Sequence, residues 1–376
     1  MSSTSSAEPK CLVRGSINID EFFHLPHIVR PGETISSTSL TKRAGGKGAN
    51  QAFAVARAGR QVVLDGCVGS DGVWVKEMLE KGGVDVGRVQ VLEDELTGRA
   101  IIQSAADGEN SIVLHAGANY HLPSSSSTHS LPPNLDGITH LLLQNEIPLS
   151  STLSYLTSAG SSGSVTSVFN PSPMLTPDQL RHFPWKDLSW LIVNEGELGD
   201  LLLAFSSPSA SSSQCSSAED GNVPNSDEKD VVGALDENSS TLIEDAKKGI
   251  LALHRNSFFS PYVGVICTLG SKGILYFDPI LESESISASA SASPNGTEQV
   301  GYLPAGKLVN PLKDTTGAGD CFAGYFIAGL MERQEAGTGD LESILKTCLT
   351  ACAICVENQG AMESVPSRSS VNERLA

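Results

Sequence analysis

Short, continuous apolar runs recur along this chain, and they constrain its fold more than any other feature. They lie at residues 11–13, 62–68, 140–143, 165–169, 191–193, 263–269 and 274–277. Runs without alternation are typical of strands in a parallel sheet that helices cover on both faces, and the stretches 49–58 and 73–81 can form such helices. The pattern predicts an α/β protein with three layers, α/β/α, around a mostly parallel sheet.

Two further stretches, 35–40 and 99–114, alternate between apolar and polar residues. The second contains the turn sequence Asp107-Gly108-Glu109-Asn110, whose glycine suits a hairpin. Alternation indicates strands with one face in solvent. We therefore expect a small second sheet beside the central one.

Composition excludes several classes of partner. The net charge of −18 would repel a polyanion, and no cluster of Lys and Arg offsets it, so we expect neither nucleic acid nor an anionic membrane to bind. No apolar run approaches the length of a membrane span, and the start MSSTSSAEPK lacks the features of a secretory signal. We expect the protein in the cytoplasm, and in the nucleus as well.

Four segments are too polar to bury the apolar surface that would offset the entropy of ordering them. They are the tail 1–10 and three Ser-rich inserts at about 124–130, 206–240 and 282–297. We expect all four to be disordered, and the rest of 11–376 to form one domain.

The segment Asp314-Thr315-Thr316-Gly317-Ala318-Gly319-Asp320 directly precedes the apolar run 321–330. Small residues at 317–319 allow backbone N–H groups to converge at a helix N-terminus, where they attract phosphate. A carboxylate there would repel a phosphate, so Asp320 suits a base that deprotonates an attacking alcohol. The pattern indicates a small-molecule kinase, and its alternative is an ordinary helix start capped by small residues.

A second glycine segment, Gly45-Gly46-Lys47-Gly48-Ala49-Asn50, precedes a helix-like run of alanines. Its glycines would let a ligand approach the backbone, while Lys47 and Asn50 offer polar contacts. It is not a Walker A loop, because no Ser or Thr follows the lysine. The alternative is a glycine turn that lets a helix pack closely.

In this order, the two segments resemble the two signatures of the ribokinase-like (phosphofructokinase-B) carbohydrate kinases. Further matches fall in the family's order at 15–20, 115–119, 170–173, 194–197 and 268–273, and Lys47 in its segment resembles the ribokinase branch. The resemblance covers about residues 11–366. It implies the ribokinase-like fold, in which the segments 16–43 and 98–120 form a β-sheet lid over the sugar that two subunits of a homodimer share.

The resemblance also implies site residues. Around the sugar it places Asn18, Ile19, Asp20, Gly46, Lys47, Gly48, Ala49, Asn50, Glu146 and Asp320. Around ATP it places Asn194, Thr268, Leu269, Gly270, Ser271, Lys272, Gly273, Gly319 and Asp320. Asp320 would be the catalytic base, with an anion hole at Gly317, Ala318, Gly319 and Asp320. Asp20 could accept hydrogen bonds from two sugar hydroxyls, although an Asp in a turn is the alternative.

Two ions belong to this interpretation. Magnesium would bridge the ATP phosphates while Asn194 and Glu197 organise its water shell, and the same pair also suits a capped helix start. The resemblance implies a potassium site at Asp314, Thr316, Cys355, Asn358, Gly360 and Ser364. Because hard cations prefer oxygen, Cys355 would contribute its carbonyl and not its sulfur.

The resemblance implies transfer of the ATP γ-phosphate to the 5-hydroxyl of D-ribose. Alternatives are a kinase for a related sugar or nucleoside, such as deoxyribose or another pentose, and a catalytically silent sugar-binding protein on the same scaffold. Asp320 and both glycine segments are intact, which speaks against a silent protein.

Overall fold

The computed structural model describes residues 8–121, 132–206, 237–279, 300–337 and 340–376. Within them a nine-stranded central sheet has the order β13-β12-β11-β10-β9-β8-β1-β4-β5. Its strands are β1 (Lys10–Arg14), β4 (Gln61–Gly69), β5 (Asp85–Leu92), β8 (His140–Leu143), β9 (Thr166–Phe169), β10 (Trp190–Asn194), β11 (Gly264–Thr268), β12 (Ile274–Phe277) and β13 (Gly301–Leu303). All neighbours pair in parallel except at the edge formed by β12 and β13.

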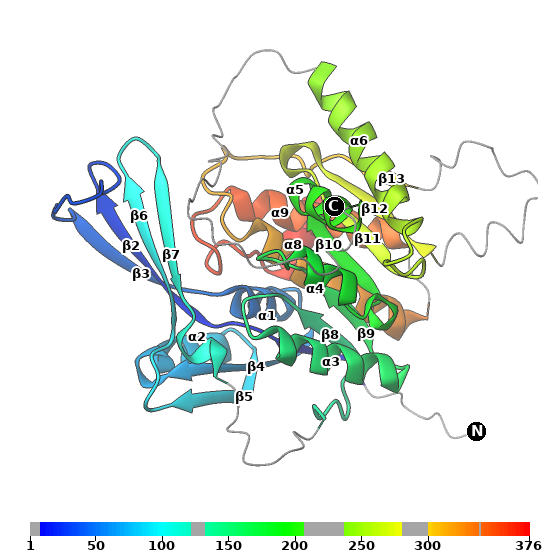
Figure 1. Cartoon of the computed structure of the whole chain (residues 1–376), viewed down its shortest axis with the longest axis horizontal. Coiled ribbons are helices and arrows are strands. Elements are labelled where there is room, and N and C mark those ends of the chain that lie inside the picture. The colour runs from blue at the N-terminus through cyan, green and yellow to red at the C-terminus, as the bar shows by residue number, and fades with distance from the viewer. Residues whose placement is uncertain (1–7, 122–131, 207–236, 280–299, 338–339) are drawn as a thin grey trace, which may run out of the picture.

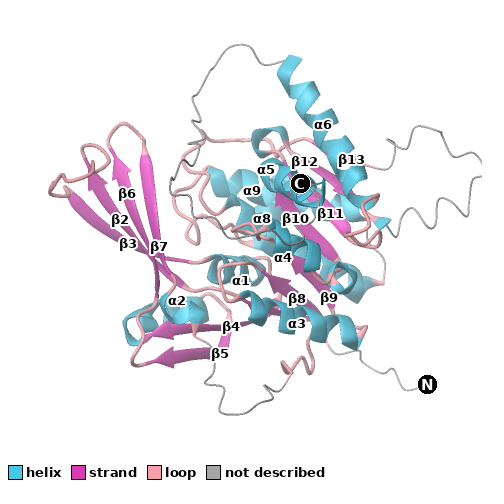
Figure 2. Ribbon diagram, viewed as in Figure 1, coloured by secondary structure: helices cyan, strands magenta, loops and turns pink. Residues whose placement is uncertain are grey.

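Helices cover both faces of this sheet, because side chains from one strand enter two different cores. Cys11 and Val13 pack with residues of α1 (Lys47–Arg57), α2 (Val73–Lys81), α8 (Ala318–Ala336), α9 (Leu341–Val356) and α10 (Arg368–Leu375). Leu12 packs on the opposite face with residues of α3 (Leu149–Ser162), α4 (Pro177–His182), α5 (Glu195–Ser206) and α6 (Glu237–His254). The predicted α/β/α layers are confirmed (Figures 1 and 2).

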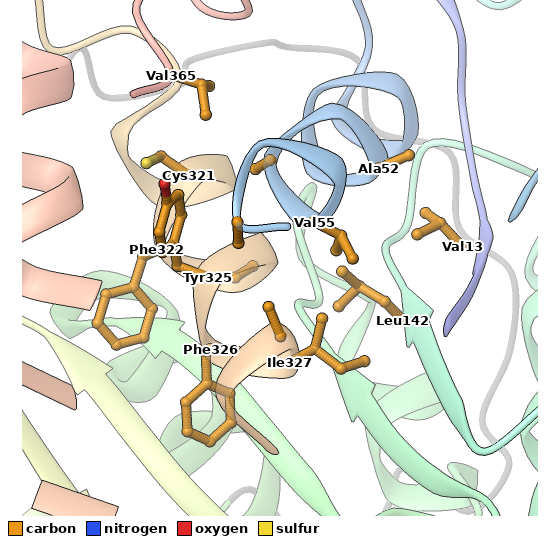
Figure 3. Packing of buried hydrophobic residues seen from close by; sticks show 14 of the residues in the cluster. Val13, Ala52, Val55, Leu142, Cys321, Phe322, Tyr325, Phe326, Ile327 and Val365 are labelled. Atoms are coloured by element: carbon orange, nitrogen blue, oxygen red, sulfur yellow. The ribbon is translucent and has the colours of Figure 1, made fainter. Parts of the chain in front are cut away.

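Helix α8 is the centre of the first core. Its residues from Asp320 to Met331 are all buried, because α1, α9 and the sheet surround it. Figure 3 shows Tyr325, Phe326 and Ile327 of α8 near Val55 of α1 and Leu142 of the sheet. A helix that is apolar all round has this environment. Its first turn is therefore fixed in place by the core.

A second sheet projects from the body of the molecule (Figure 1). It has the order β3-β2-β6-β7, with β2 at Asn18–Leu25, β3 at Ser39–Gly45, β6 at Gly98–Ala105 and β7 at Asn110–His115. The hairpin predicted within 99–114 is confirmed, since Gly108 has a φ of 92° and the Ala105 N–H donates to the Glu109 carbonyl at 2.9 Å. The strand predicted over 35–40 was wrong for residues 35–38, because β3 begins only at Ser39.

Other boundaries also differ from the predictions. Lys10, expected in the tail, is the first residue of β1, and α6 begins at Glu237, inside the insert expected at 206–240. Residues 1–7, the insert 124–130, the part 207–236 of the second insert and the insert 282–297 lie outside the described residues. Among the described residues, no helix has the length and apolar character that crossing a bilayer requires.

Candidate active site

The order of strands reverses between β1 and β8. Strands β4 and β5 follow on one side of β1, while β8 to β11 follow on the other. Ligands of open α/β sheets bind outside the carboxyl ends of the strands at such a point. Residues Gly15–Ile17 after β1 and Gln144–Glu146 after β8 lie at this edge, and they meet the N-terminus of α1 there.

The glycines before and within α1 allow this meeting. Gly46 has a φ of 90°, a conformation that favours glycine, and a Cβ on Gly48 would lie 2.5 Å from the Gly15 carbonyl carbon. The close approach lets Glu146 accept hydrogen bonds from the Ser16 hydroxyl at 2.5 Å and from the Lys47 N–H at 2.9 Å. Glu146 is thereby fixed at the start of α1.

Asp320 lies on the first turn of α8 and is 7% exposed. Its Oδ2 accepts from Asn50 Nδ2 and its Oδ1 from Gln51 Nε2, each at 2.9 Å. Gln51 Oε1 in turn accepts from Gln144 Nε2 at 2.6 Å. Two amides therefore orient the carboxylate. Neither Gln51 nor Gln144 was predicted as a site residue from the sequence, although Gln51 directly follows the second glycine segment.

Asn50 carries a second relevant atom. Its Oδ1 is buried, and no described group donates a hydrogen bond to it. A buried acceptor without a donor costs free energy unless a ligand or water completes it. A sugar hydroxyl beside Asp320 could donate to this oxygen.

The turn before α8 has the conformation expected for anion binding. Gly317 is the N-cap residue with a φ of 78°, and a Cβ there would lie 2.7 Å from the Ala361 Cα. No heavy atom lies within 4 Å of the place where a Cβ on Gly319 would stand, so this side of the turn is open. One of the four N–H groups expected in the anion hole is engaged, because that of Ala318 donates to the Thr315 carbonyl at 3.2 Å.

Asp20 lies on β2 opposite Arg43 of β3. Burial, together with the carboxylates of Glu146, Glu363 and Asp320, raises the pKa of Asp20 to about 7, while Arg43 acts in the opposite direction. Burial opposes the charge on Lys47, but the carboxylates of Asp320, Glu146 and Glu197 outweigh it and raise the Lys47 pKa. Charged groups from several elements therefore converge at this site.

Three other residues expected around the sugar are placed differently from one another. The Oδ1 of Asn18 accepts a hydrogen bond from Asn119 Nδ2 at 2.7 Å, and the Oδ1 of Asn119 accepts one from the Ile17 N–H at 2.8 Å. The side chains of Ile19 and Ala49 are buried in the hydrophobic core, and the Ala49 N–H donates to the Ser16 carbonyl. Neither side chain is available to a polar ligand, so Ile19 and Ala49 shape the site from behind.

A cavity of about 440 Å³ lies on the other side of the α8 turn. Thr268, Gly270, Ser271 and Gly273 line it together with Ala318 and Gly319, so it joins the expected ATP residues to the anion turn. Three other residues expected around ATP do not line this cavity. Leu269 is buried in the second hydrophobic core, and Lys272 is not among the lining residues. Asn194 lies at the end of β10, where it pairs with Thr268 of β11.

The apolar wall of this cavity was missed by the sequence analysis. It comes from the segment after β13, from α8 and from α9, through Ala305, Gly306, Leu308, Leu312, Thr315, Phe322, Leu349, Cys352, Ala353 and Val356. An apolar slot beside an anion turn suits a nucleotide, with its base in the slot and its phosphates at the helix N-terminus.

Asn194 and Glu197 form a reciprocal cap at the start of α5. The Asn194 N–H donates to Glu197 Oε2 at 2.9 Å, and the Glu197 N–H donates to Asn194 Oδ1 at 2.8 Å. The capped helix start that the sequence allowed is therefore present. Each oxygen retains a lone pair that can accept from a water.

Asp314 links the anion turn to the segment after α9. Its Oδ1 accepts from the Thr316 N–H and its Oδ2 from the Gly360 N–H, each at 2.9 Å. These hydrogen bonds outweigh the effect of burial and hold the pKa of Asp314 below its ordinary value. In the same segment the Cys355 carbonyl accepts from the Asn358 N–H, and the Ser364 hydroxyl lies 3.0 Å from the Cys355 sulfur. The residues expected around potassium thus belong to two segments, 314–316 and 355–364, which the hydrogen bond from Gly360 to Asp314 joins.

Comparison with known proteins agrees with this arrangement. Residues 8–368 match the family described as pfkB family carbohydrate kinase. The chain belongs to that family. It is a carbohydrate kinase, and the predicted family and fold are confirmed.

Ribokinases are prominent among the similar proteins. The ribokinase of Haemophilus influenzae is 30% identical over 366 residues, which cover 96% of this chain and 97% of that protein. The crystal structure of ribokinase from Cryptococcus neoformans var. grubii serotype A in complex with ADP is 62% identical, with a TM-score of 0.77, and the match covers 97% of this chain and 99% of that one. The structure of Arabidopsis thaliana ribokinase complexed with ribose and ATP is 25% identical, with a TM-score of 0.70, and covers 98% of this chain and 99% of that one.

Proposed function

We propose that the protein is an ATP-dependent ribokinase, which transfers the γ-phosphate of ATP to the 5-hydroxyl of D-ribose and yields ribose 5-phosphate and ADP. One observation carries the proposal. Asp320 lies between a group of charged side chains that includes Asp20 and Glu146 and a largely apolar cavity that Ala318 and Gly319 help to line. The pfkB family match and the similarity to ribokinases along nearly the whole chain support the same reaction.

The sugar is held by polar groups that converge from three elements. Asp20 and Asn18 come from β2, Lys47 and Asn50 from the start of α1, and Glu146 from the segment after β8. Ionised carboxylates accept hydrogen bonds from adjacent hydroxyls, and the orphaned Oδ1 of Asn50 is a further acceptor. Gly46 and Gly48 let the start of α1 approach the segment after β1, because a Cβ on Gly46 would lie 2.8 Å from the Asn18 nitrogen and one on Gly48 would lie 2.5 Å from the Gly15 carbonyl carbon.

Asp320 acts as the base. The amides of Asn50 and Gln51 orient its carboxylate so that one oxygen can take the proton of the attacking hydroxyl. The N–H groups at the start of α8 and the positive end of that helix stabilise charge on the transferred phosphoryl group. Because Ala318 already donates to Thr315, the N–H groups of Gly317, Gly319 and Asp320 carry most of this role.

Two cations complete the proposal. A magnesium ion bound with ATP neutralises charge between the phosphates. Asn194 and Glu197 fit its water shell, because both present oxygen acceptors at the end of β10, beside Thr268 of the nucleotide cavity. Asp314 and the carbonyls of Thr316, Cys355, Asn358 and Gly360, with the Ser364 hydroxyl, offer oxygens that suit potassium.

The second sheet is proposed as a lid that closes over the sugar and joins two subunits into a homodimer. Leu40, Ile101 and Val113 lie on the face of this sheet that also carries Glu21, and they are 48%, 36% and 56% exposed. Apolar side chains exposed together in this way are typical of a surface that contacts another protein. Light scattering of the purified protein gives its mass in solution. A cytoplasmic location that extends to the nucleus is our further expectation, and imaging of a fluorescent fusion tests it.

The test is ATP consumption with a panel of sugars, run with Asp320→Asn and a control. We expect D-ribose to be the best acceptor, and we expect kcat of Asp320→Asn to fall on the order of 10²–10⁴-fold while both substrates still bind. Asp85→Asn, an exposed carboxylate that pairs with Lys10, should leave kcat unchanged. A preference for deoxyribose or a nucleoside would show that the proposed acceptor, D-ribose, is wrong. Binding of sugar and ATP without turnover by the wild type would indicate a catalytically silent protein.

A further inference from the structure

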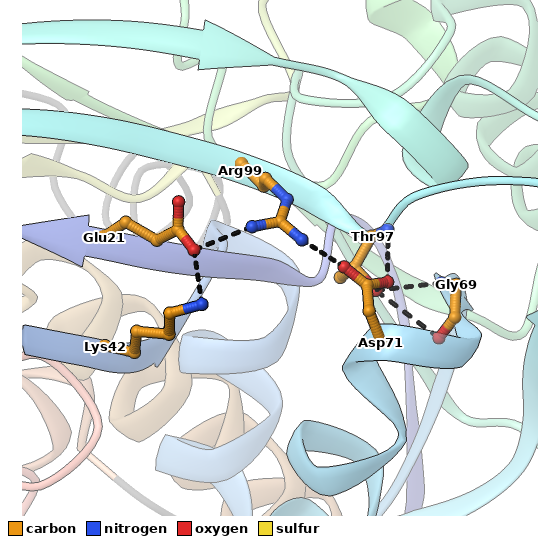
Figure 4. Close-up of polar contacts among 6 residues, drawn as sticks. All are labelled: Glu21, Lys42, Gly69, Asp71, Thr97 and Arg99. Carbon is orange, nitrogen blue, oxygen red and sulfur yellow. Dashed lines mark hydrogen bonds and ion pairs between the residues drawn. The ribbon is translucent and has the colours of Figure 1, made fainter.

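A chain of alternating charges connects the second sheet to the central sheet (Figure 4). Arg99 of β6 donates from Nη1 to Glu21 Oε1 of β2 at 2.7 Å, and its Nη2 pairs with Asp71. The same Glu21 oxygen accepts from Lys42 Nζ of β3 at 2.8 Å. We call Glu21, Lys42, Asp71, Thr97 and Arg99 the hinge cluster.

The cluster is anchored on the central sheet. Asp71 belongs to η1 (Ser70–Gly72), the turn that directly follows β4. Its Oδ1 accepts from the Thr97 N–H at 2.9 Å and from the Thr97 hydroxyl at 2.7 Å, and that hydroxyl oxygen accepts from the Gly69 N–H at 2.9 Å. Thr97 is fully buried, so this end of the cluster cannot shift without disturbing the core.

The other end of the cluster lies one residue from the candidate sugar site. Strands β2 and β6 pair in parallel, with Ile19 opposite Arg99 and Asp20 opposite Ala100. Successive residues of a strand point to opposite faces, so Glu21 faces the cluster while Asp20 faces the site. Fixing Glu21 relative to β4 therefore fixes where β2 presents Asp20 and Asn18.

Burial and geometry separate this cluster from an ordinary surface ion pair. The side chains of Glu21, Asp71 and Arg99 are 10%, 26% and 20% exposed, whereas pairs of little energetic worth are open to solvent. An arginine presents donors in a planar fork and can bridge two carboxylates, which the single ammonium of lysine does poorly. Here one carboxylate, Glu21, belongs to the second sheet, and the other, Asp71, belongs to the turn that follows β4 of the central sheet.

We infer that Arg99 is a positioning residue for the sugar site. It holds the second sheet at the angle where Asp20 and Asn18 can bind the sugar, and it does not touch the sugar itself. The identity of that sugar rests on the proposed function, whereas the contacts of Arg99 with Glu21 and Asp71 do not depend on it. Loss of the bridge should weaken sugar binding and leave nucleotide binding intact, because no member of the hinge cluster is among the residues that line the nucleotide cavity.

The experiment compares Arg99→Gln with Arg60→Gln. Arg60 is a matched control, because it also bridges two carboxylates, Glu332 and Glu335, and is 18% exposed, but it lies away from the second sheet. For Arg99→Gln we expect KM for the sugar to rise about 10-fold, because Gln carries no charge and its single amide cannot bridge Glu21 and Asp71 as the guanidinium does. KM for ATP and kcat should stay within about twofold. Arg60→Gln should change neither KM.

Hydrogen exchange in the free protein gives a readout that needs no substrate. Arg99→Gln should speed exchange of the amides in β2 and β6, while those in β10 and β11 keep their wild-type rates. This result would support the positioning role even if ribose proved not to be the substrate. If the Gln variant does not fold, Arg99→Lys, which keeps the charge but not the planar fork, takes its place and should also raise KM for the sugar, by less than 10-fold, without raising KM for ATP.

Three outcomes would overturn the inference. One is an equal rise of both KM values in Arg99→Gln, and another is unchanged exchange in β2 and β6. The third is additivity of Arg99→Gln with Asp71→Asn in sugar binding, since two members of one bridge must be coupled.

Discussion

Replacing Glu357 by Gln should destabilise the protein strongly, because this carboxylate joins three parts of the chain. Glu357 follows α9 and is 2% exposed. Its Oε1 accepts from the Val309 N–H at 2.6 Å and from Arg374 Nη1 at 2.8 Å. Its Oε2 accepts from Asn310 Nδ2 at 3.0 Å and from Arg374 Nη2 at 2.9 Å.

The magnitude follows from these contacts. The bidentate Arg374 is the main cause that lowers the pKa of Glu357 to about 2, from an ordinary value of 4.5. At about 1.4 kcal/mol for each pH unit, that difference corresponds to about 3 kcal/mol of folding free energy. Gln keeps the shape but turns an N–H₂ group toward the donors of Asn310 and Arg374. We therefore expect the free energy of unfolding to fall by about 2–4 kcal/mol.

Urea unfolding of the two proteins at pH 7 measures this loss. A carboxylate whose pKa is lowered by folding stabilises the protein fully above its unfolded pKa, and the contribution disappears as pH falls through the folded pKa. The difference between wild type and Glu357→Gln should thus be constant from pH 7 to pH 5 and begin to shrink below about pH 4.5.

A functional readout accompanies the stability measurement. Val309 and Asn310 lie in the segment that contributes Leu308 and Leu312 to the nucleotide cavity, so KM for ATP should rise while KM for the sugar does not. Glu342→Gln, an exposed carboxylate paired with Lys346, is the control and should change neither stability nor KM. A loss below about 1 kcal/mol for Glu357→Gln would refute the reasoning, because it would mean that the charge pair with Arg374 and the hydrogen bonds of Glu357 together contribute little to the free energy of unfolding.

Three further predictions concern other parts of the chain. Because the pKa of Asp20 is raised to about 7, sugar affinity should increase from pH 6 to pH 8 as Asp20 ionises, and Asp20→Asn should abolish that dependence in binding titrations. Potassium at matched ionic strength should raise kcat of the wild type but not of Asp314→Ala, and equal wild-type rates with and without potassium would exclude a cation site there. Replacing residues 207–236 with a short Gly-Ser linker should leave kcat and the melting temperature nearly unchanged, as the polar composition of this segment implies, and an insoluble product would contradict it.

The central sheet was predictable because its strands are buried on both faces. A strand such as β10 carries a continuous run of apolar residues from Trp190 to Val193, all buried, as expected for a strand of a parallel sheet that helices cover on both faces. Strand β2 lies within the lid segment 16–43 that the family resemblance implied, but its own pattern of apolar residues did not predict it, for a related reason. Its phenylalanines Phe22 and Phe23 lie on opposite faces of a half-exposed sheet, so the sequence shows neither a clean alternation nor a continuous run.

The wrong strand at 35–38 has a geometric cause. Pairing between β2 and β3 ends at His24 and Ser39, and the Thr38 N–H still donates to the His24 carbonyl. The residues before Thr38 extend beyond the end of β2 and have no partner strand in the described part of the sheet. Alternation alone does not make a strand where no neighbour is available.

The candidate site divides in the same way. Asn50 and Asp320 could be predicted, because each lies in a glycine-rich helix start with its own pattern. Gln144 could not, since it follows β8 without any motif and reaches Asp320 only through Gln51. The contribution of the segment 304–312 to the cavity wall could not be predicted from the sequence either, because only tertiary packing brings this segment beside α9. The packing is close, since a Cβ on Gly306 would lie 2.3 Å from the Leu349 carbonyl oxygen.

The charges of the site explain why the proposed reaction needs bound cations. The carboxylates of Glu146, Glu363 and Asp320 act on Asp20 as like charges, while Arg43 acts on it in the opposite direction. Lys47 is a second basic group, on which Asp320 and Glu146 also act. Two basic side chains do not offset four carboxylates together with a triphosphate, and the chain as a whole carries −18. The start of α8 contributes only about half a positive charge. We therefore expect an acidic site of this kind to bind ATP as its magnesium complex, so ATP affinity should fall steeply when EDTA removes divalent cations, and more steeply than sugar affinity does.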